Sequence, residues 1–190
     1  MKKTAFIVLT GGPGAGKTAV LEMIRKIYGP SLTLLPEAAS LLFNGGFPRI
    51  NSVKASRAAQ RAIYHVQNES QNVVVSASKS KFAICDRGTL DGLAYWRGQK
   101  KDFFKELHTN LTSEYKKYKA VIHLQSPGLD KGYNHQNPVR TETVHEAMQI
   151  DSQIQKVWEG HPQYFRVEST INFIEKANIA TQIINSIIQE

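Results

Sequence analysis

Short apolar runs alternate with stretches of helical periodicity along the whole chain. The apolar runs are bounded by glycine, proline or polar residues, which is typical of buried strands in a parallel sheet, and they lie at about 4–10, 32–35, 82–85, 120–124 and 164–167. Between and after them, helical spacing is expected at about 16–28, 38–43, 52–78, 90–96, 102–107 and 141–159, and a closing amphipathic helix is expected to carry Ile174, Ala177, Ile183, Ile184 and Ile187. The alternation predicts an α/β fold in which helices cover both faces of a parallel sheet of about five strands.

The 190 residues are expected to form a single domain, because no linker, repeat or low-complexity segment divides them. One stretch departs from the alternation. Residues 125–138 have no periodicity and are rich in glycine, proline and asparagine. Long aperiodic segments within a domain are often functional, so a lid is predicted at about 125–140.

The apolar run that ends at Thr10 leads directly into a glycine-rich loop. Eight residues there fit the phosphate-binding pattern G-x-x-x-x-G-K-[ST]: Gly11, Gly12, Pro13, Gly14, Ala15, Gly16, Lys17 and Thr18. Glycines let backbone N–H groups turn inward toward phosphate oxygens. Lys17 is then expected to reach the β- and γ-phosphates, and the Thr18 hydroxyl to ligate Mg²⁺. The loop therefore predicts binding of ATP with Mg²⁺.

Two carboxylates follow the next two strands of the predicted sheet, Glu37 after the second and Asp86 after the third. The carboxyl ends of parallel strands meet at one edge of a sheet, so both side chains are expected near the glycine loop. Asp86 is a candidate to hold Mg²⁺ through its water ligands. The alternative is that Asp86 merely caps the helix that follows it.

The residue after Asp86 separates classes of nucleotide-dependent protein. Motor ATPases commonly carry a glutamate there to activate water, whereas this chain has Arg87. The Asn-Lys-x-Asp signature of guanine-nucleotide switches is also absent from the sequence. Both observations argue against a motor ATPase or a GTPase.

The glycine loop, Pro36-Glu37 and Asp86-Arg87-Gly88 together resemble the P-loop kinases of nucleosides and nucleotides. The run from Asp86 to Trp96 more closely resembles a branch of AAA-type ATPases or kinase-like proteins, which is related to the ribosylnicotinamide kinase domain of bifunctional NAD regulators. The resemblance extends to 137–140 and to His161-Pro162, and so covers most of the chain. It implies the strand order 2-3-1-4-5 and ATP-dependent phosphoryl transfer to a small, nucleoside- or nucleotide-like metabolite.

The resemblance also suggests roles for single residues. Glu37 is a candidate general base for an acceptor hydroxyl, or a hydrogen-bond partner of the acceptor, and an exposed glutamate at a helix start is the alternative. Asp86 competes for the role of base. Arg87 either clamps a phosphate or carboxylate or braces the loop. Arg140 resembles a lid arginine that closes on the transferring phosphate, with a surface arginine as the alternative.

Two further functions stay open. A regulatory ATPase or switch would need only nucleotide binding, and a polynucleotide kinase has only the net charge of +8 in its support. The basic residues are scattered, and the densest cluster, at Lys116, Lys117 and Lys119, is expected on the polar side of a helix. Nucleic acid is therefore not the expected partner, and a small phosphate acceptor is.

The remaining composition fits a cytoplasmic protein that does not span a membrane. No apolar run reaches 18 residues, and the stretch after Met1 is too short for a secretion signal. Cys85, the single cysteine, lies in an apolar strand and is expected to be a core residue. The six histidines show no metal-ligand spacing, so no zinc site is expected. Tyr95 and Trp96 either stack on the acceptor or belong to the core.

Overall fold

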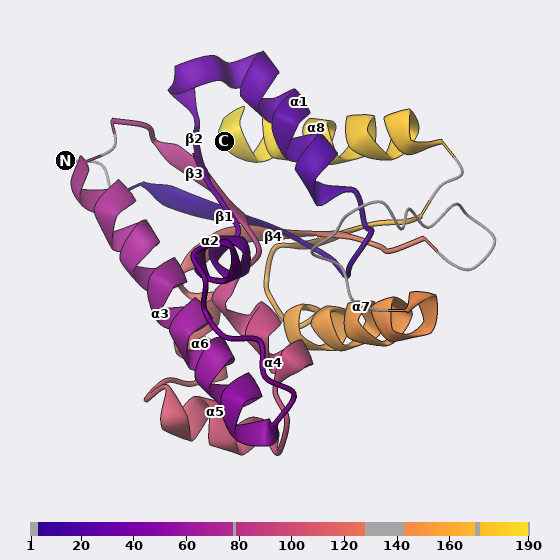
Figure 1. The fold of residues 1–190 in the computed structure, drawn as a ribbon. Helices are drawn as coiled ribbons and strands as arrows, with labels where there is room; N and C mark the ends of the chain where they lie inside the picture. The colour runs from indigo at the N-terminus through magenta and orange to yellow at the C-terminus, as the bar shows by residue number, and fades with distance from the viewer. Residues whose placement is uncertain (1–3, 78, 128–142, 170–171, 190) are drawn as a thin grey trace.

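Five parallel strands form the centre of the molecule, in the order β2-β3-β1-β4-β5 (Figure 1). The structure is a computed structural model that describes residues 4–77, 79–127, 143–169 and 172–189. The strands are β1 (Ala5–Thr10), β2 (Thr33–Leu35), β3 (Phe82–Asp86), β4 (Tyr118–Leu124) and β5 (Tyr164–Val167). Strand number, direction and order confirm the predicted sheet.

Helices cover both faces of this sheet, as the alternating pattern predicted. On one face lie α1 (Lys17–Tyr28) and α8 (Phe173–Gln189). On the other face lie α3 (Val53–Ala77), α4 (Gly92–Tyr95), α5 (Lys100–Glu106), α6 (Leu111–Tyr115) and α7 (Val144–Trp158), and α2 (Ala38–Asn44) precedes α3. Short 3₁₀ turns occupy Gly29–Ser31 and Thr89–Asp91. The three-layer α/β architecture is thereby confirmed.

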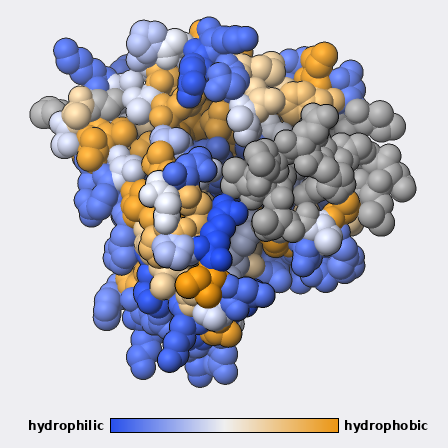
Figure 2. Space-filling view, viewed as in Figure 1, coloured by the Kyte–Doolittle hydropathy of each residue, from blue (hydrophilic) through white to orange (hydrophobic). Residues whose placement is uncertain are grey.

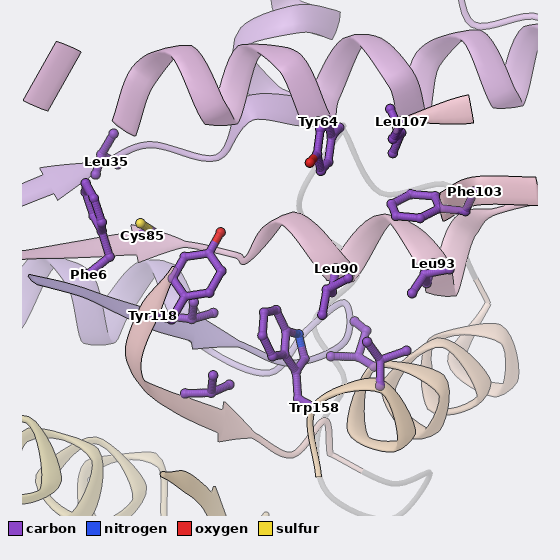
Figure 3. Packing of buried hydrophobic residues seen from close by; sticks show 14 of the residues in the cluster. Phe6, Leu35, Tyr64, Cys85, Leu90, Leu93, Phe103, Leu107, Tyr118 and Trp158 are labelled. Carbon is purple, nitrogen blue, oxygen red and sulfur yellow. The ribbon is translucent and has the colours of Figure 1, made fainter. Parts of the chain in front are cut away.

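Successive residues of the central strands enter different cores, which explains why the strands are apolar throughout. Ile7 and Leu9 of β1 pack toward α1 and α8, whereas Phe6 and Val8 pack toward the opposite helices. The second core is rich in aromatic rings and has Trp158 near its centre (Figure 3). A strand buried on both faces has no polar side, so period-two alternation is absent.

Apolar residues on the face viewed in Figure 1 gather near the middle and upper part of the molecule, while the outer surface of the lower helices is mostly hydrophilic (Figure 2). No helix in the described part of the chain is long and apolar enough to cross a membrane.

Two expectations about local structure need correction. Lys116 and Lys117 follow the end of α6, and Lys119 lies in β4, so the lysine cluster does not share one face of a helix. Helix α6 ends at Tyr115 because the apolar sequence from Tyr118 onward joins the sheet. The second correction concerns the start of the preceding helix, α5, which begins at Lys100 rather than at about Asp102.

Two predictions about core residues have clear outcomes. Cys85 is buried, and burial raises the pKa of its thiol to about 12, which keeps it protonated at neutral pH. Trp96 belongs to the core, with its ring edge-on to Phe103 at 5.4 Å between centroids. Tyr95 is only half-buried and lies beneath the Arg87 guanidinium, 5.8 Å from ring centroid to Cζ.

Candidate functional site

A cavity of about 750 Å³ opens at the carboxyl ends of β1, β2 and β3. The glycine loop forms one wall, and α2, α3, α4 and α7 contribute the others. The strand register explains this convergence, because Leu9 pairs with Asp86 and Leu35 pairs with Cys85, which brings three strand ends to one edge. The predicted site residues that line the cavity are Pro13, Gly14, Lys17, Thr18, Glu37, Asp86 and Arg87.

The loop has a backbone that requires glycine at several positions. Gly16 has φ +90°, and a Cβ atom there would lie 2.5 Å from the Phe173 ring. Gly11 has φ +136°, and its Cβ would lie 2.1 Å from the Leu124 carbonyl oxygen. Neither conformation suits an L side chain, and neither neighbour leaves room for one. The two outer glycines of the motif are therefore explained by backbone angle and by packing together.

Lys17 reaches back over its own loop. Its Nζ donates hydrogen bonds to the carbonyl oxygens of Gly11, at 2.9 Å, and Gly12, at 3.1 Å. Burial lowers the pKa of this ammonium to about 8, with a further lowering by Arg87, against the opposing effect of Asp86 and Glu37. The ammonium group is thus held against the backbone of the loop, where the phosphates of a nucleotide would contact it.

Arg87 is an internal brace of the site. It follows β3 with φ 76°, an unusual angle for a side chain this large. Its Nε donates to Glu37 Oε1 at 2.5 Å, and its Nη1 donates to the Gly11 carbonyl at 3.2 Å and to Asp91 Oδ2 at 3.4 Å. The guanidinium therefore ties the end of β2, the glycine loop and the turn after β3 together.

Both oxygens of Glu37 are engaged in hydrogen bonds. Oε1 accepts from Arg87, and Oε2 accepts from the Ser40 hydroxyl at 2.5 Å. Although burial acts in the opposite direction, the nearby Arg87 charge and the Ser40 hydrogen bond lower the pKa of Glu37 to about 2. Glu37 does stand at the start of a helix, as the N-cap residue of α2, but its side chain is only 26 % exposed, so it is not the exposed glutamate of the alternative.

Asp86 differs from Glu37 in its surroundings. Its Oδ1 atom is buried and has no hydrogen-bond partner among the described residues. Burial raises the pKa of the carboxyl, while Lys17 and Arg87 act to lower it. Asp86 and the exposed Thr18 line the same cavity, and a carboxylate with a hydroxyl is a donor set that suits a hydrated Mg²⁺. Thr18 and Asp86 therefore fit the predicted metal.

Asp91 is a buried site residue that has no counterpart among the sequence predictions. Its Oδ2 accepts from the Thr10 hydroxyl at 2.5 Å and from Arg87, and its Oδ1 accepts from Trp158 Nε1 at 2.7 Å. Asp91 thereby fixes the turn after Asp86 against β1 and α7. The signal that the sequence offers is the position of Asp91 directly after the apolar Leu90. The turn is buried in the structure, and a buried carboxylate needs hydrogen-bond partners within the protein.

Uncharged polar and aromatic side chains also line the cavity, together with the charged Arg49 and Arg97. Gln60 and Gln67 lie on the same side of α3, and Tyr95 and Trp96 come from the end of α4. Trp96 Nε1 is buried without a hydrogen-bond partner among the described residues. Gln67 donates its amide to the Arg87 carbonyl, which links α3 to the carboxylate centre.

The predicted lid, 125–140, is described only as far as residue 127. Arg140 lies outside the described residues, so its role on the transferring phosphate stays a prediction. Within the described part of the chain, no three His, Cys, Asp or Glu side chains gather into a group that could hold a metal ion.

A family model described as an AAA domain matches residues 6–173. The matched range contains the glycine loop, Glu37, Asp86, Arg87 and the whole described cavity lining. A P-loop NTPase-like fold and a nucleotide-binding role are what this match indicates. A search of curated proteins found no match.

Proposed function

The chain belongs to the AAA domain family, and on that premise we propose that it is a phosphotransferase that uses ATP and Mg²⁺ to phosphorylate a small, nucleoside- or nucleotide-like acceptor. The observation that carries the proposal is the continuity of the cavity. The cavity that Lys17 and Asp86 line is also lined by Gln60 and Tyr95, side chains that the phosphates of ATP would not need. Hydrolysis of ATP alone would not require these further lining residues.

The size and lining of the cavity favour a small acceptor. The whole cavity, including the part next to the glycine loop, measures about 750 Å³, which lies within the usual range of small-molecule sites, about 300–1,000 Å³. The Gln60 amide can hydrogen-bond the edge of a planar polar group, and the Tyr95 ring offers a stacking surface. The net charge of +8 is the only support for a polynucleotide acceptor.

In the proposed reaction, the acceptor oxygen attacks the γ-phosphorus of ATP. A new oxygen–phosphorus bond forms, the bond between the γ-phosphorus and the β,γ-bridging oxygen breaks, and ADP leaves. Lys17 neutralises charge on the β- and γ-phosphates, and inward N–H groups of the loop hold the phosphate oxygens. Mg²⁺, held by Thr18 and through water by Asp86, would neutralise the charge that the departing ADP gains.

Of the two candidate bases, Asp86 is better suited to accept the proton of an acceptor hydroxyl. A base needs an oxygen that is not already engaged in hydrogen bonds. Asp86 has an oxygen, Oδ1, with no hydrogen-bond partner among the described residues, and burial raises the pKa of its carboxyl. Glu37 has both oxygens engaged and a pKa of about 2. Glu37 instead holds Arg87, and Arg87 holds the loop.

The position after Asp86 supports transfer to an acceptor over transfer to water. Arg87 points its guanidinium at Glu37, Gly11 and Asp91, so this position supplies no base for a water molecule. A regulatory ATPase or switch is the alternative that an experiment must separate from the kinase.

The test is a screen of pooled nucleosides, nucleotides and related metabolites with ATP and Mg²⁺, followed by mass spectrometry. The proposal predicts one class of product that has gained one phosphoryl group, and none in the Lys17→Ala variant. If ATP is consumed with no organic phosphorylated product from any pool, the phosphotransferase proposal fails.

A further inference from the structure

The side of the glycine loop that faces away from the cavity is fixed by buried side chains that the proposed reaction does not use. On α7, Asp151 Oδ1 accepts a hydrogen bond from the Gly12 N–H at 2.6 Å. Just after β4, the Ser126 hydroxyl donates to the Pro13 carbonyl oxygen at 3.0 Å. Asp151 and Ser126 are both buried, with 6 % of each exposed. Two consecutive loop residues are thus bonded to two different elements.

A third contact comes from the opposite layer. Lys176 on α8 is 4 % exposed, and its Nζ donates to the Ala15 carbonyl at 2.8 Å and to the Gln125 carbonyl at 2.5 Å. Burial lowers the pKa of this ammonium to about 8, while the Asp151 charge acts to raise it. Placing a buried cation on two carbonyl oxygens is costly in desolvation, and those contacts are the compensation that the structure provides.

Helix α7 also touches the loop directly. A Cβ atom at Gly12 would lie 2.8 Å from Asp151 Cβ and 3.0 Å from the Ala147 carbonyl oxygen. The second glycine of the loop is therefore required by the approach of α7. Because Gly12 sits against α7, Asp151 holds its N–H without an intervening water molecule.

Two buried neighbours of Asp151, His123 and Ser126, orient its carboxylate. His123 at the end of β4 is fully buried, and its Nε2 lies 3.0 Å from Asp151 Oδ1. The Ser126 hydroxyl lies 3.3 Å from the same oxygen. Although burial acts in the opposite direction, the His123 contact lowers the pKa of Asp151, so the carboxylate is ionised at neutral pH.

We propose that Asp151, Ser126 and Lys176 form a clamp, called here the loop clamp, whose role is to hold the glycine loop in its phosphate-binding conformation before nucleotide arrives. A loop rich in glycine has large conformational freedom when it is unrestrained. Ordering such a loop when nucleotide binds would cost conformational entropy and weaken the affinity. A loop that is already ordered avoids this loss. These three are positioning residues, because each acts on the backbone of the loop and none lines the cavity.

The inference rests on nucleotide binding at the loop, and it does not depend on phosphoryl transfer. Its two charged members lie 139 and 161 residues along the chain from the loop atoms they bond. The loop clamp therefore also links α7 and α8, on opposite faces of the sheet, to a single phosphate site.

The experiment measures the affinity for Mg·ADP by titration calorimetry in the full chain, together with the thermal midpoint without nucleotide. The variants are Ser126→Ala, Asp151→Asn and Lys176→Met. The matched control is Thr181→Val, which removes a buried hydroxyl whose partner among the described residues is the Ala177 carbonyl, on the same helix as Lys176. We expect affinity to fall about threefold in Ser126→Ala and tenfold or more in the other two, and to stay within twofold in the control.

Ser126→Ala keeps the test decisive if a charged variant fails to fold, since it removes one hydroxyl and leaves both buried charges in place. Variants that melt earlier but bind Mg·ADP within twofold of the wild type would show that these contacts only stabilise the fold, and would overturn the proposal. A wild-type chain that binds no Mg·ADP would overturn it as well. If the variants lose affinity for Mg·ADP as expected but the wild-type chain phosphorylates no acceptor, the proposed function is wrong and the loop clamp is still supported.

Discussion

The Arg87 guanidinium donates to the Glu37 carboxylate at 2.5 Å, and this ion pair gives the two carboxylates of the site different properties. Glu37 is held ionised with its oxygens occupied. Asp86, one residue before the arginine, has a raised pKa and an oxygen without a partner among the described residues. One carboxylate thus supports the loop, while the other keeps an oxygen that no described residue engages.

Replacing Asp86 by asparagine should abolish most turnover without harming the fold. The variant keeps the shape but loses both the proton acceptor and the charge that attracts Mg²⁺, so kcat should fall by about 10²–10⁴-fold. Because burial disfavours the charged form of Asp86, the free energy of unfolding at pH 7 should stay the same or rise. Steady-state kinetics over a Mg²⁺ titration, with denaturant unfolding alongside, provides the check. Turnover that stays at the wild-type level would reduce Asp86 to a structural role.

Replacing Glu37 by glutamine should have a smaller effect on turnover. The amide still accepts a hydrogen bond from Arg87 but no longer neutralises it, so the brace on the Gly11 carbonyl is weakened. We expect kcat to fall about tenfold, with the dissociation constant for Mg·ATP within about threefold of the wild type. A loss in kcat equal to that of Asp86→Asn would contradict this account and would place Glu37 as the base.

The same ion pair predicts a pH dependence of stability. Glu37 has a pKa of about 2 in the folded protein, against an ordinary value of 4.5. A lowered pKa contributes stability that is fully present above pH 4.5 and is lost as the pH falls toward 2. The difference in unfolding free energy between wild type and Glu37→Gln should therefore be about 2 kcal/mol at pH 6 and should shrink steadily toward pH 3. A difference that is constant across this range would show that the pKa of Glu37 is not lowered.

The lowered pKa of Lys17 predicts that nucleotide binding depends on pH in the alkaline range. Its pKa of about 8 lies below the ordinary 10.5, so the free protein loses this charge above pH 8. Phosphate oxygens favour the charged form, so binding at pH 9 should take up a proton, and affinity should fall by up to about tenfold per pH unit. Calorimetry in buffers of different ionisation enthalpy measures the uptake. Lys17→Arg stays charged and serves as the control; equal uptake in that variant would assign the proton to another group.

The sequence predicts those parts of this molecule that depend on neighbouring residues. Apolar runs such as Ile84 and its neighbours mark strands because both of their faces are buried. The loop follows from its glycines and Lys17, and Asp86 follows from its place after a strand. The strand order came from the resemblance to P-loop kinases, because spacing along the chain does not determine which strands are neighbours.

The remainder depends on contacts between distant segments. In the sequence, Asp151 is one of several polar residues on an amphipathic helix, and Lys176 is one of many lysines. Only the fold shows that both contact the loop. The role of Arg87 was open for the same reason, since its brace uses Glu37, which lies 50 residues earlier. Helix α6 has five residues, too few to produce a periodic pattern.

The central claim is that the γ-phosphoryl group goes to an acceptor and not to water. The most direct measurement compares ADP formed with inorganic phosphate released, with and without the acceptor pool that gives a product in the mass screen. We predict slow ADP formation without acceptor, an acceleration of about 100-fold or more with it, and recovery of the phosphoryl group in the organic product. Equal amounts of ADP and inorganic phosphate, formed at a rate that no acceptor changes, would contradict the account and identify a regulatory ATPase.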